Sequence, residues 1–360
     1  MPNTDNRKKC TLLLIQNDCE TLKTIILNHR NSVFSMCLIP YMALFCRSIQ
    51  EYLNIELVSP EVDAEICDIR NSIKLFGERF GKGKKRFLAS DEKQNQELQD
   101  MLRFKFMKKW NIHYNLGIYF DENGHVVGDT QLIDDMLKMS GLSEDERAKK
   151  SFSLGCNLAS VIGSISRGME IKPPDIQIDA SIPGFYYCDV NTNKTPFFNS
   201  SFEKEVNLFA LHILGNLGFV KYNLEPMVTA QNPWLLRIKY IATYYSYCGL
   251  RVLERHLEQL KQEQSSKFVE AAKTVDQAGE HLFDSTFRNC MMHYDLVENG
   301  TFAISEACYD ETKPLFGLVE TCFNNATYES FTAEIDSLGE MIEKLLVSQF
   351  NFKTLQIKKL

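Results

Sequence analysis

Three polar side chains, Arg288, Asn289 and His293, lie close together in the chain and could perform chemistry on a phosphate ester. An imidazole titrates near pH 6.5, so it can accept and donate protons at neutral pH. A guanidinium offers a planar fork of donors for phosphate oxygens and for the charge on a pentacoordinate phosphorus. The neighbouring amide can orient either group. Together these residue types suit cleavage of RNA without a metal, in which the 2′-hydroxyl attacks the neighbouring phosphate.

A helix must position these residues, and the pattern predicts one over residues 266–293. On a regular helix Asn289 and His293 are an i,i+4 pair and share one face. His281 and Ser285 fall on the same polar face, so we predict that they are accessory site residues. The opposite face is apolar and is expected to pack into a core.

The spacing from Arg288 to His293 is a weak signal on its own, because Arg251 and His256 repeat it. The second pair lies within a predicted helix among other charged residues, which is typical of a solvated face. Arg288 and His293 instead come at a predicted helix end, before a loop with Asn299, and an asparagine directly follows the arginine. We therefore take this pair as the candidate site.

Two structural explanations of the same residues stay open. Asp284 precedes Arg288 by four residues and could hold it in a surface ion pair, which typically contributes only tenths of a kcal/mol. A histidine at a helix C-terminus is favoured by the helix dipole without any catalytic role, and this applies to His293.

The stretch from Arg288 through Asn289 to His293 resembles the motif of the HEPN superfamily. That motif is an arginine, usually a polar residue, three to five further residues and a histidine, within an all-helical bundle. The resemblance extends from about residue 200 to about residue 355. It implies that Arg288 and His293 are catalytic and that Asn289 supports them.

The resemblance also implies a function and partners. Many HEPN proteins are metal-independent endoribonucleases of toxin–antitoxin or antiviral defence systems, and they typically act as homodimers whose two motifs meet in a cleft. RNA, a second copy of the chain, and an antitoxin or regulatory protein are the expected partners, and no cofactor is expected. Other HEPN proteins are non-catalytic modules, so binding of nucleic acid, a nucleotide or a protein partner is the alternative. A purely structural interaction protein is the third hypothesis.

A second candidate is a basic segment after Gly77, which we predict to be a flexible charged loop. Its cations could contact RNA phosphates, although most charged loops are simply solvated. The spacing does not match a phosphate-binding P-loop. The candidate RNA-binding residues are Arg79, Lys82, Lys84, Lys85 and Arg86.

Charge is distributed unevenly along the chain, which has 360 residues and a formal net charge of −7. Residues 1–110 carry 18 basic and 14 acidic residues, whereas residues 261–360 carry 9 and 16. The candidate site therefore lies in the most acidic third. That segment alone is not expected to attract nucleic acid over a broad surface. If RNA binds there, basic side chains must be concentrated locally at the site.

The cysteines and the apolar segments indicate a compartment. The 11 cysteines show no CxxC pair and no zinc-ribbon spacing, and no other metal-ligand pattern is visible. We expect buried thiols in a reducing cytoplasm. The N-terminus lacks the apolar core of a signal peptide. The longest apolar run, 33–46, is shorter than a membrane span, so we expect no membrane association and a cytoplasmic protein.

The rest of the chain predicts a mainly α protein. Helices are expected over residues 11–58, divided at Pro40, and then over 61–76, 91–110, 132–139, 144–165, 202–217, 233–261 and 328–350, with a short piece at 314–323. A β-hairpin is expected at 115–127, around the Asn-Gly of its turn. We predict two domains: a mostly helical N-terminal domain of unknown role at 1–197, containing this hairpin, and an HEPN-like helical bundle at 198–360.

Overall fold

The computed structural model describes residues 4–29, 31–77, 80–101, 114–168, 184–260, 263–324 and 326–360. It begins with helices α1 (Thr4–Asn28) and α2 (Ser32–Leu53). The predicted division into two helices is confirmed, but its position at Pro40 is wrong. Asn31 ends the break by capping α2, and Pro40 lies inside this helix. An interior proline costs about 3 kcal/mol in a helix, and the extensive burial of α2 compensates for it.

Helix α2 is long and apolar enough to cross a membrane by length and composition, and 72% of its most apolar window is buried inside the protein. Leu38, Phe45 and Ile49 are fully or almost fully buried. The helix therefore lies in the core of this fold, as predicted for the apolar run.

Helix α3 (Pro60–Ser72) and the 3₁₀ turn η1 (Ile73–Gly77) follow as predicted. The predicted flexible loop after Gly77 is wrong from Phe80 onward, because α4 (Phe80–Met101) begins there. Its glycines cost about 1 kcal/mol each in a helix. That cost is outweighed by packing of α4 against later helices and by a buried network in which Asp91 accepts hydrogen bonds from Asn115 and Thr192.

The predicted hairpin is confirmed as β1 (Leu116–Phe120) and β2 (Val126–Asp129). Its turn places Gly124 at φ 84°, a conformation that glycine adopts readily. The sequence did not reveal that this hairpin belongs to a four-stranded antiparallel sheet, in the order β2-β1-β3-β6. Strand β3 (Tyr186–Val190) was not predicted, and β6 (Lys358–Lys359) pairs with its edge.

Residues 102–110 of the helix predicted over 91–110 lie outside the described residues. The remaining helices include those predicted, with one break, and also unpredicted helical segments at 219–227 and 352–354. They are α6 (Thr130–Met136), α7 (Glu144–Gly168), α8 (Lys204–Gly218), the π-helix η2 (Phe219–Leu224), η3 (Glu225–Met227), α9 (Pro233–Leu260), α10 (Glu263–Gly279), η4 (Glu280–Leu282), α11 (Ser285–His293), η5 (Pro314–Gly317), α12 (Leu318–Cys322), α13 (Tyr328–Val347) and η6 (Phe352–Thr354). The predicted helix over 266–293 is therefore wrong as a single helix. A two-residue hairpin of β4 (Val297–Glu298) and β5 (Thr301–Phe302) follows α11.

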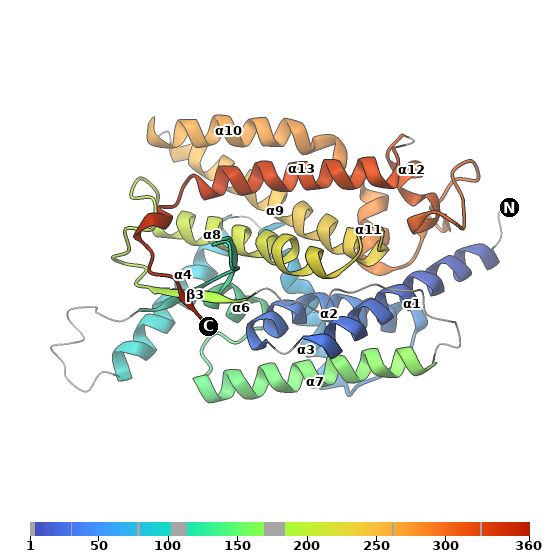
Figure 1. Ribbon diagram of the computed structural model, residues 1–360, viewed down its shortest axis with the longest axis horizontal. Coiled ribbons are helices and arrows are strands. Elements are labelled where there is room, and N and C mark those ends of the chain that lie inside the picture. Colours follow the sequence, from blue (N-terminus) through green and yellow to red (C-terminus); the bar gives the residue numbers. More distant parts are fainter. Residues whose placement is uncertain are drawn as a thin grey trace.

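The long helices lie side by side along the long axis of the molecule, with α10 and α13 along one edge and α7 along the other (Figure 1). The sheet lies beside the C-terminus of the chain, which is marked C in Figure 1. Packing crosses the predicted domain boundary at 197/198, because α1 contacts α9, β2 contacts α8, and α2 contacts α11. The protein is thus mostly helical with a small antiparallel sheet, and the two-domain division stays a prediction.

Candidate functional site

Helix α11 carries Arg288, Asn289 and His293, and it is capped at both ends. At its N-terminus the side chain of Asp284 accepts a hydrogen bond from the backbone N–H of Phe287 at 2.8 Å. This cap separates α11 from α10, which explains the break in the predicted helix, since aspartate is a strong N-cap residue. At the other end Tyr294 adopts a left-handed conformation. His293 is therefore the last residue of a helix, as predicted.

The last carbonyls of α11 are held by side chains from two other helices. The buried Arg237 of α9 donates to the carbonyl oxygens of Cys290 (3.1 Å) and Met291 (2.7 Å). Ser48 of α2 donates to the carbonyl of Met292 at 2.7 Å. Carbonyls at a helix C-terminus have no partner within the helix, so these bonds satisfy groups that would otherwise be orphaned. The position of His293 is thus fixed by contacts from both halves of the chain.

Arg237 is itself held by a buried carboxylate. Its Nε donates to Asp18 of α1 at 2.9 Å, and both side chains are fully buried. Its guanidinium lies 3.8 Å from the centre of the Tyr294 ring, and the Tyr294 hydroxyl donates to the same aspartate. A buried charge needs such a partner because desolvation of an unpaired ion costs several kcal/mol. We call Asp18, Arg237 and Tyr294 the buried clamp.

Arg288 and Asn289 contact each other directly. The half-buried guanidinium donates to Asn289 Oδ1 at 3.0 Å and to the hydroxyl of Tyr244 on α9 at 3.3 Å. The hydrogen bond that Arg288 donates to Tyr244 is the main cause of the raised pKa of Arg288. The predicted alternative of an ion pair between Asp284 and Arg288 is not formed. Asp284 caps α11, and Arg288 contacts α9. Tyr240, also on α9, is fully buried, whereas Tyr244 uses its hydroxyl to hold Arg288.

His293 contacts residues of the N-terminal half. Nη2 of Arg70, on α3, lies 3.2 Å from Nδ1 and 3.5 Å from Nε2 of the imidazole. Glu51, on α2, lies 3.8 Å from Nδ1. The His293 side chain is 48% exposed, so it is accessible to a ligand. Partial burial and then repulsion from Arg70 lower the pKa of His293, against a smaller opposing effect of Glu51.

Two further cations lie near Arg70: Lys74, which also acts on His293, and Arg288, which acts on Lys74. We call Arg70, Lys74 and Arg288 the cationic cluster. Arg70 and Arg288 both lower the pKa of Lys74, after burial, which is the largest cause. Within the described residues, none of the three has a carboxylate at ion-pair distance, whereas several other buried cations of the protein do. Sequence reasoning missed Arg70 and Lys74. The only feature of the sequence that relates these two cations is their i,i+4 spacing at the end of a predicted helix.

The two predicted accessory residues do not join this cluster. His281 lies on η4, outside α11, and its Nε2 is 2.9 Å from Glu334 of α13. Its side chain is 66% exposed. Ser285 is the exposed first residue of α11. The prediction that His281 shares the face of His293 is wrong, because it assumed an unbroken helix and His281 lies outside α11. Ser285 precedes Asn289 by four residues and His293 by eight on the same helix, and its accessory role stays a prediction.

The basic segment is helical from Phe80 onward, and most of its side chains lie outside the described part of the structure. Arg79 lies outside the described residues, as do the side chains of Lys82, Lys84 and Arg86 on α4. Lys85 is exposed. A role of this segment in RNA binding stays a prediction.

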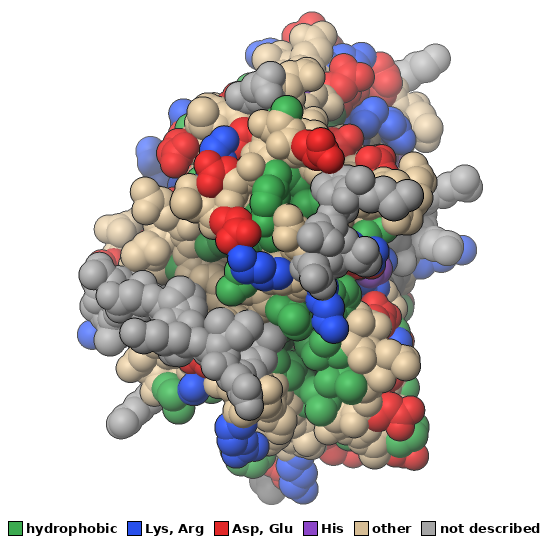
Figure 2. Space-filling model, turned by 90° about the vertical axis from the view of Figure 1, so that its right-hand side faces the viewer, with side chains coloured by type: hydrophobic (Ala, Val, Ile, Leu, Met, Phe, Trp, Pro, Cys, Tyr) green, Lys and Arg blue, Asp and Glu red, His purple; other side chains and the backbone are tan. Residues whose placement is uncertain are grey.

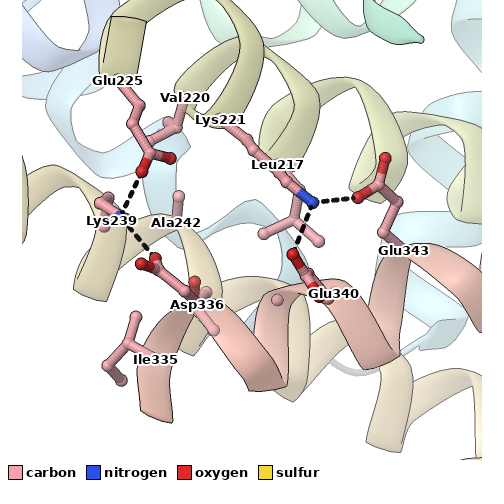
Figure 3. Close-up of a pocket in the computed structure, with 12 residues that line it drawn as sticks. Leu217, Val220, Lys221, Glu225, Lys239, Ala242, Ile335, Asp336, Glu340 and Glu343 are labelled. Atoms are coloured by element: carbon pink, nitrogen blue, oxygen red, sulfur yellow. Dashed lines mark hydrogen bonds and ion pairs between the residues drawn. The ribbon is translucent and has the colours of Figure 1, made fainter. Parts of the chain in front are cut away.

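A second polar cluster surrounds a cavity of about 110 Å³ between η2, α9 and α13 (Figure 3). Lys221 lies 2.9 Å from Glu343 and 3.4 Å from Glu340. Lys239 lies 3.0 Å from Glu225 and 2.5 Å from Asp336. Each lysine is therefore matched by two carboxylates. We call this group the carboxylate-paired cluster.

Over the described ranges, no three His, Cys, Asp or Glu side chains lie close enough together to hold a metal ion.

On the face seen in Figure 2, Lys and Arg side chains are interspersed with Asp and Glu around exposed hydrophobic side chains. Large fields of one sign are what steer nucleic acids over a distance, and this face does not present one.

Comparison of the chain with family models, with curated proteins and with solved structures gave no match.

Proposed function

We propose that this protein is a metal-independent endoribonuclease of the HEPN type, with Arg288, Asn289 and His293 in its active site. The observation that carries the proposal is the cationic cluster beside a half-exposed histidine. Cations without carboxylate partners can neutralise a phosphodiester and the charge that develops on its phosphorus. The resemblance of the motif to the HEPN superfamily, on a mostly helical chain, supports the same activity.

The reaction assigns a role to each side chain. The neutral imidazole of His293 accepts the proton of the 2′-hydroxyl as the oxygen attacks phosphorus, and the proton then passes to the departing 5′-oxygen as the P–O5′ bond breaks. The products are a 2′,3′-cyclic phosphate and a 5′-hydroxyl. Arg288 stabilises the phosphorane charge, and Asn289 holds its guanidinium at 3.0 Å. Partial burial and Arg70 lower the pKa of His293, which favours the neutral imidazole that can accept this proton.

The biological setting is part of the same proposal. A cytoplasmic toxin or antiviral effector would need RNA as substrate, and an antitoxin or regulatory protein would restrain it. Homodimerisation would place two motifs in one cleft. Arg70 and Lys74 beside His293 are two further cations of the same chain. Because they add positive charge to the site, RNA binding depends less on cations from a second copy of the protein.

A non-catalytic phosphate-binding module is the second candidate function. It is favoured by one observation: Arg288 is engaged by Tyr244 and Asn289, while the described contacts of His293 are with Arg70 and Glu51. Such a site would bind RNA or a nucleotide without cleaving it.

Cleavage of a labelled RNA in the presence of EDTA tests the proposal. We expect His293→Gln to reduce the rate by at least about 100-fold, the usual contribution of a general acid or base. His281→Gln is the matched control, because this exposed histidine contacts Glu334 and lies outside the cationic cluster. Products ending in a 2′,3′-cyclic phosphate are expected. If the His293→Gln variant cleaves as fast as the control, the catalytic proposal is wrong, and retained RNA binding without cleavage would favour the module.

A further inference from the structure

Arg70 is an unusual cation because it is almost fully buried and has no matching carboxylate among the described residues. The residue is 6% exposed, and its Nε has no hydrogen-bond partner in the described part of the chain. Its other contacts are a long hydrogen bond of 3.4 Å to Asn71 and the approach to His293. A buried charge without a counterion is unfavourable, so this arrangement favours binding of an anion from solution.

The charges that face His293 come from three neighbouring elements. Helix α3 supplies Arg70 and the following η1 supplies Lys74, and both oppose protonation of the imidazole. Helix α2 supplies Glu51, which favours protonation. Glu51 also lies 2.9 Å from Arg47, and this arginine lies 2.5 Å from Asp63, so the negative charge near the ring is partly neutralised. On α9 the buried Arg237 holds the carbonyls of Cys290 and Met291 and is neutralised by Asp18, while Tyr244 accepts a hydrogen bond from Arg288.

We propose that the cationic cluster binds a tetrahedral oxyanion of the phosphate class, and that this binding increases the proton affinity of His293. The inference uses the site of the proposed function and describes how that site is regulated. An anion between Arg70, Lys74 and Arg288 offsets the positive potential that disfavours an imidazolium ion. His293 then gains its full ability to accept a proton only when a phosphate group occupies the site.

The coupling must be reciprocal. If the anion raises the pKa of His293, protonation of His293 must tighten anion binding by the same free energy. A rise of one pKa unit therefore corresponds to about tenfold tighter binding to the protonated form than to the neutral form. Affinity should accordingly decrease as the pH rises through the pKa of the histidine.

Sulfate is a suitable probe, because it is tetrahedral and its charge is constant between pH 5 and 8, whereas inorganic phosphate titrates in this range. The experiment follows the imidazole resonances of the full-length protein by NMR during a pH titration, with sulfate or with chloride at equal ionic strength. His293 is assigned from the His293→Gln variant. His281 is an internal control, since it contacts Glu334 at a site without these cations.

We expect sulfate to raise the pKa of His293 by about 0.5–1 unit, corresponding to roughly three- to tenfold coupling, and to leave His281 unchanged. Lys74→Gln should reduce the sulfate effect by at least half. Arg70→Gln should abolish it and raise the pKa in chloride, and the Lys74 variant serves if this buried substitution prevents folding. Equal shifts at both histidines, or no shift at His293, would overturn the proposal.

These outcomes are independent of RNA cleavage. A protein that shows the sulfate effect but leaves RNA intact retains the coupled anion site and loses the proposed activity. A protein that cleaves RNA through His293 but shows no sulfate effect retains the activity and loses the coupling.

Discussion

The cationic cluster and the carboxylate-paired cluster are both polar groups between helices, and they differ in how their charges are matched. In the carboxylate-paired cluster Lys221 and Lys239 each contact two carboxylates. In the cationic cluster Arg70, Lys74 and Arg288 have no carboxylate at ion-pair distance among the residues that the structure describes, and a half-exposed histidine lies 3.2 Å from Arg70.

This difference separates a structural group from a binding site. Where every charged side chain has an internal partner, removal of one cation leaves its carboxylates without a counterion. Such a group has no unmatched charge that a ligand could neutralise. Where cations lie together without partners, the folded chain carries unfavourable electrostatic energy that an anion from solution can relieve. The following predictions test this distinction through the effect of removing individual cations.

The largest effect is expected for Arg237, the most deeply buried of the matched cations. Arg237→Met should reduce the free energy of unfolding by about 3–5 kcal/mol, because it leaves Asp18 buried without its counterion and frees two carbonyls of α11. Urea denaturation measures the change. The Asp18→Asn/Arg237→Met double variant should be less destabilised than the single variant. A loss below about 1 kcal/mol for Arg237→Met would contradict the role of the buried clamp.

A smaller loss is expected in the carboxylate-paired cluster. Lys239→Met should reduce the free energy of unfolding by about 1–3 kcal/mol, the usual range when one partner of a charged hydrogen bond is removed. Glu225 and Asp336 remain partly exposed, so water solvates them and limits the loss. Urea denaturation is again the measurement, and RNA cleavage should be unchanged. A stabilised variant would show that this cluster is not held by its ion pairs.

The opposite sign is expected in the cationic cluster. Lys74→Met should leave the stability unchanged or increase it by up to about 0.5 kcal/mol, because it removes a like-charge i,i+4 neighbour of Arg70. The same substitution should weaken the binding of sulfate measured by calorimetry. Comparison of the Lys74 and Lys239 variants in one set of denaturation curves gives the sharpest test. If both variants lose stability equally, the distinction between the clusters fails.

The smallest effect is a pH dependence. Burial lowers the pKa of His29, and burial with repulsion from Arg70 lowers that of His293. The folded protein therefore binds protons at these sites more weakly than the unfolded chain. Their contribution to stability is complete above the unfolded pKa of about 6.5 and declines as the pH falls below it. Between pH 7.5 and 5.5 the Tm should fall slightly less in His293→Gln than in the original protein, and a larger fall would contradict the direction of this shift.

Much of the helical layout could be predicted from apolar spacing, because amphipathic helices such as α9 and α13 bury one face. The hairpin turn was predictable because Gly124 suits a positive φ. The break between α10 and α11 was missed, since Asp284 acts as a cap only when the chain departs from helical geometry. Strand β3 was missed because its pairing with β1 and β6 joins segments far apart in the sequence.

The motif on α11 was visible in the sequence, but its surroundings were not. Arg70, Lys74 and Glu51 lie more than 200 positions before His293, and no local pattern connects them to it. Tyr244 was recognised only as an aromatic residue of a helix. Its contact with Arg288 depends on how α9 and α11 cross, which is decided by packing of the whole molecule.

The buried clamp has a practical consequence for expression of the C-terminal segment, residues 198–360, by itself. A fragment that starts at residue 198 would retain Arg237 and Tyr294 but not Asp18, Ser48 or Arg70. Arg237 would then lie in an apolar interface without its counterion Asp18. The end of α11 would also lose the hydrogen bond that Ser48 donates to Met292. We expect such a fragment to aggregate or to lack a defined site, whereas co-expression of residues 1–197 as a separate chain should restore solubility if the two pieces can reassemble.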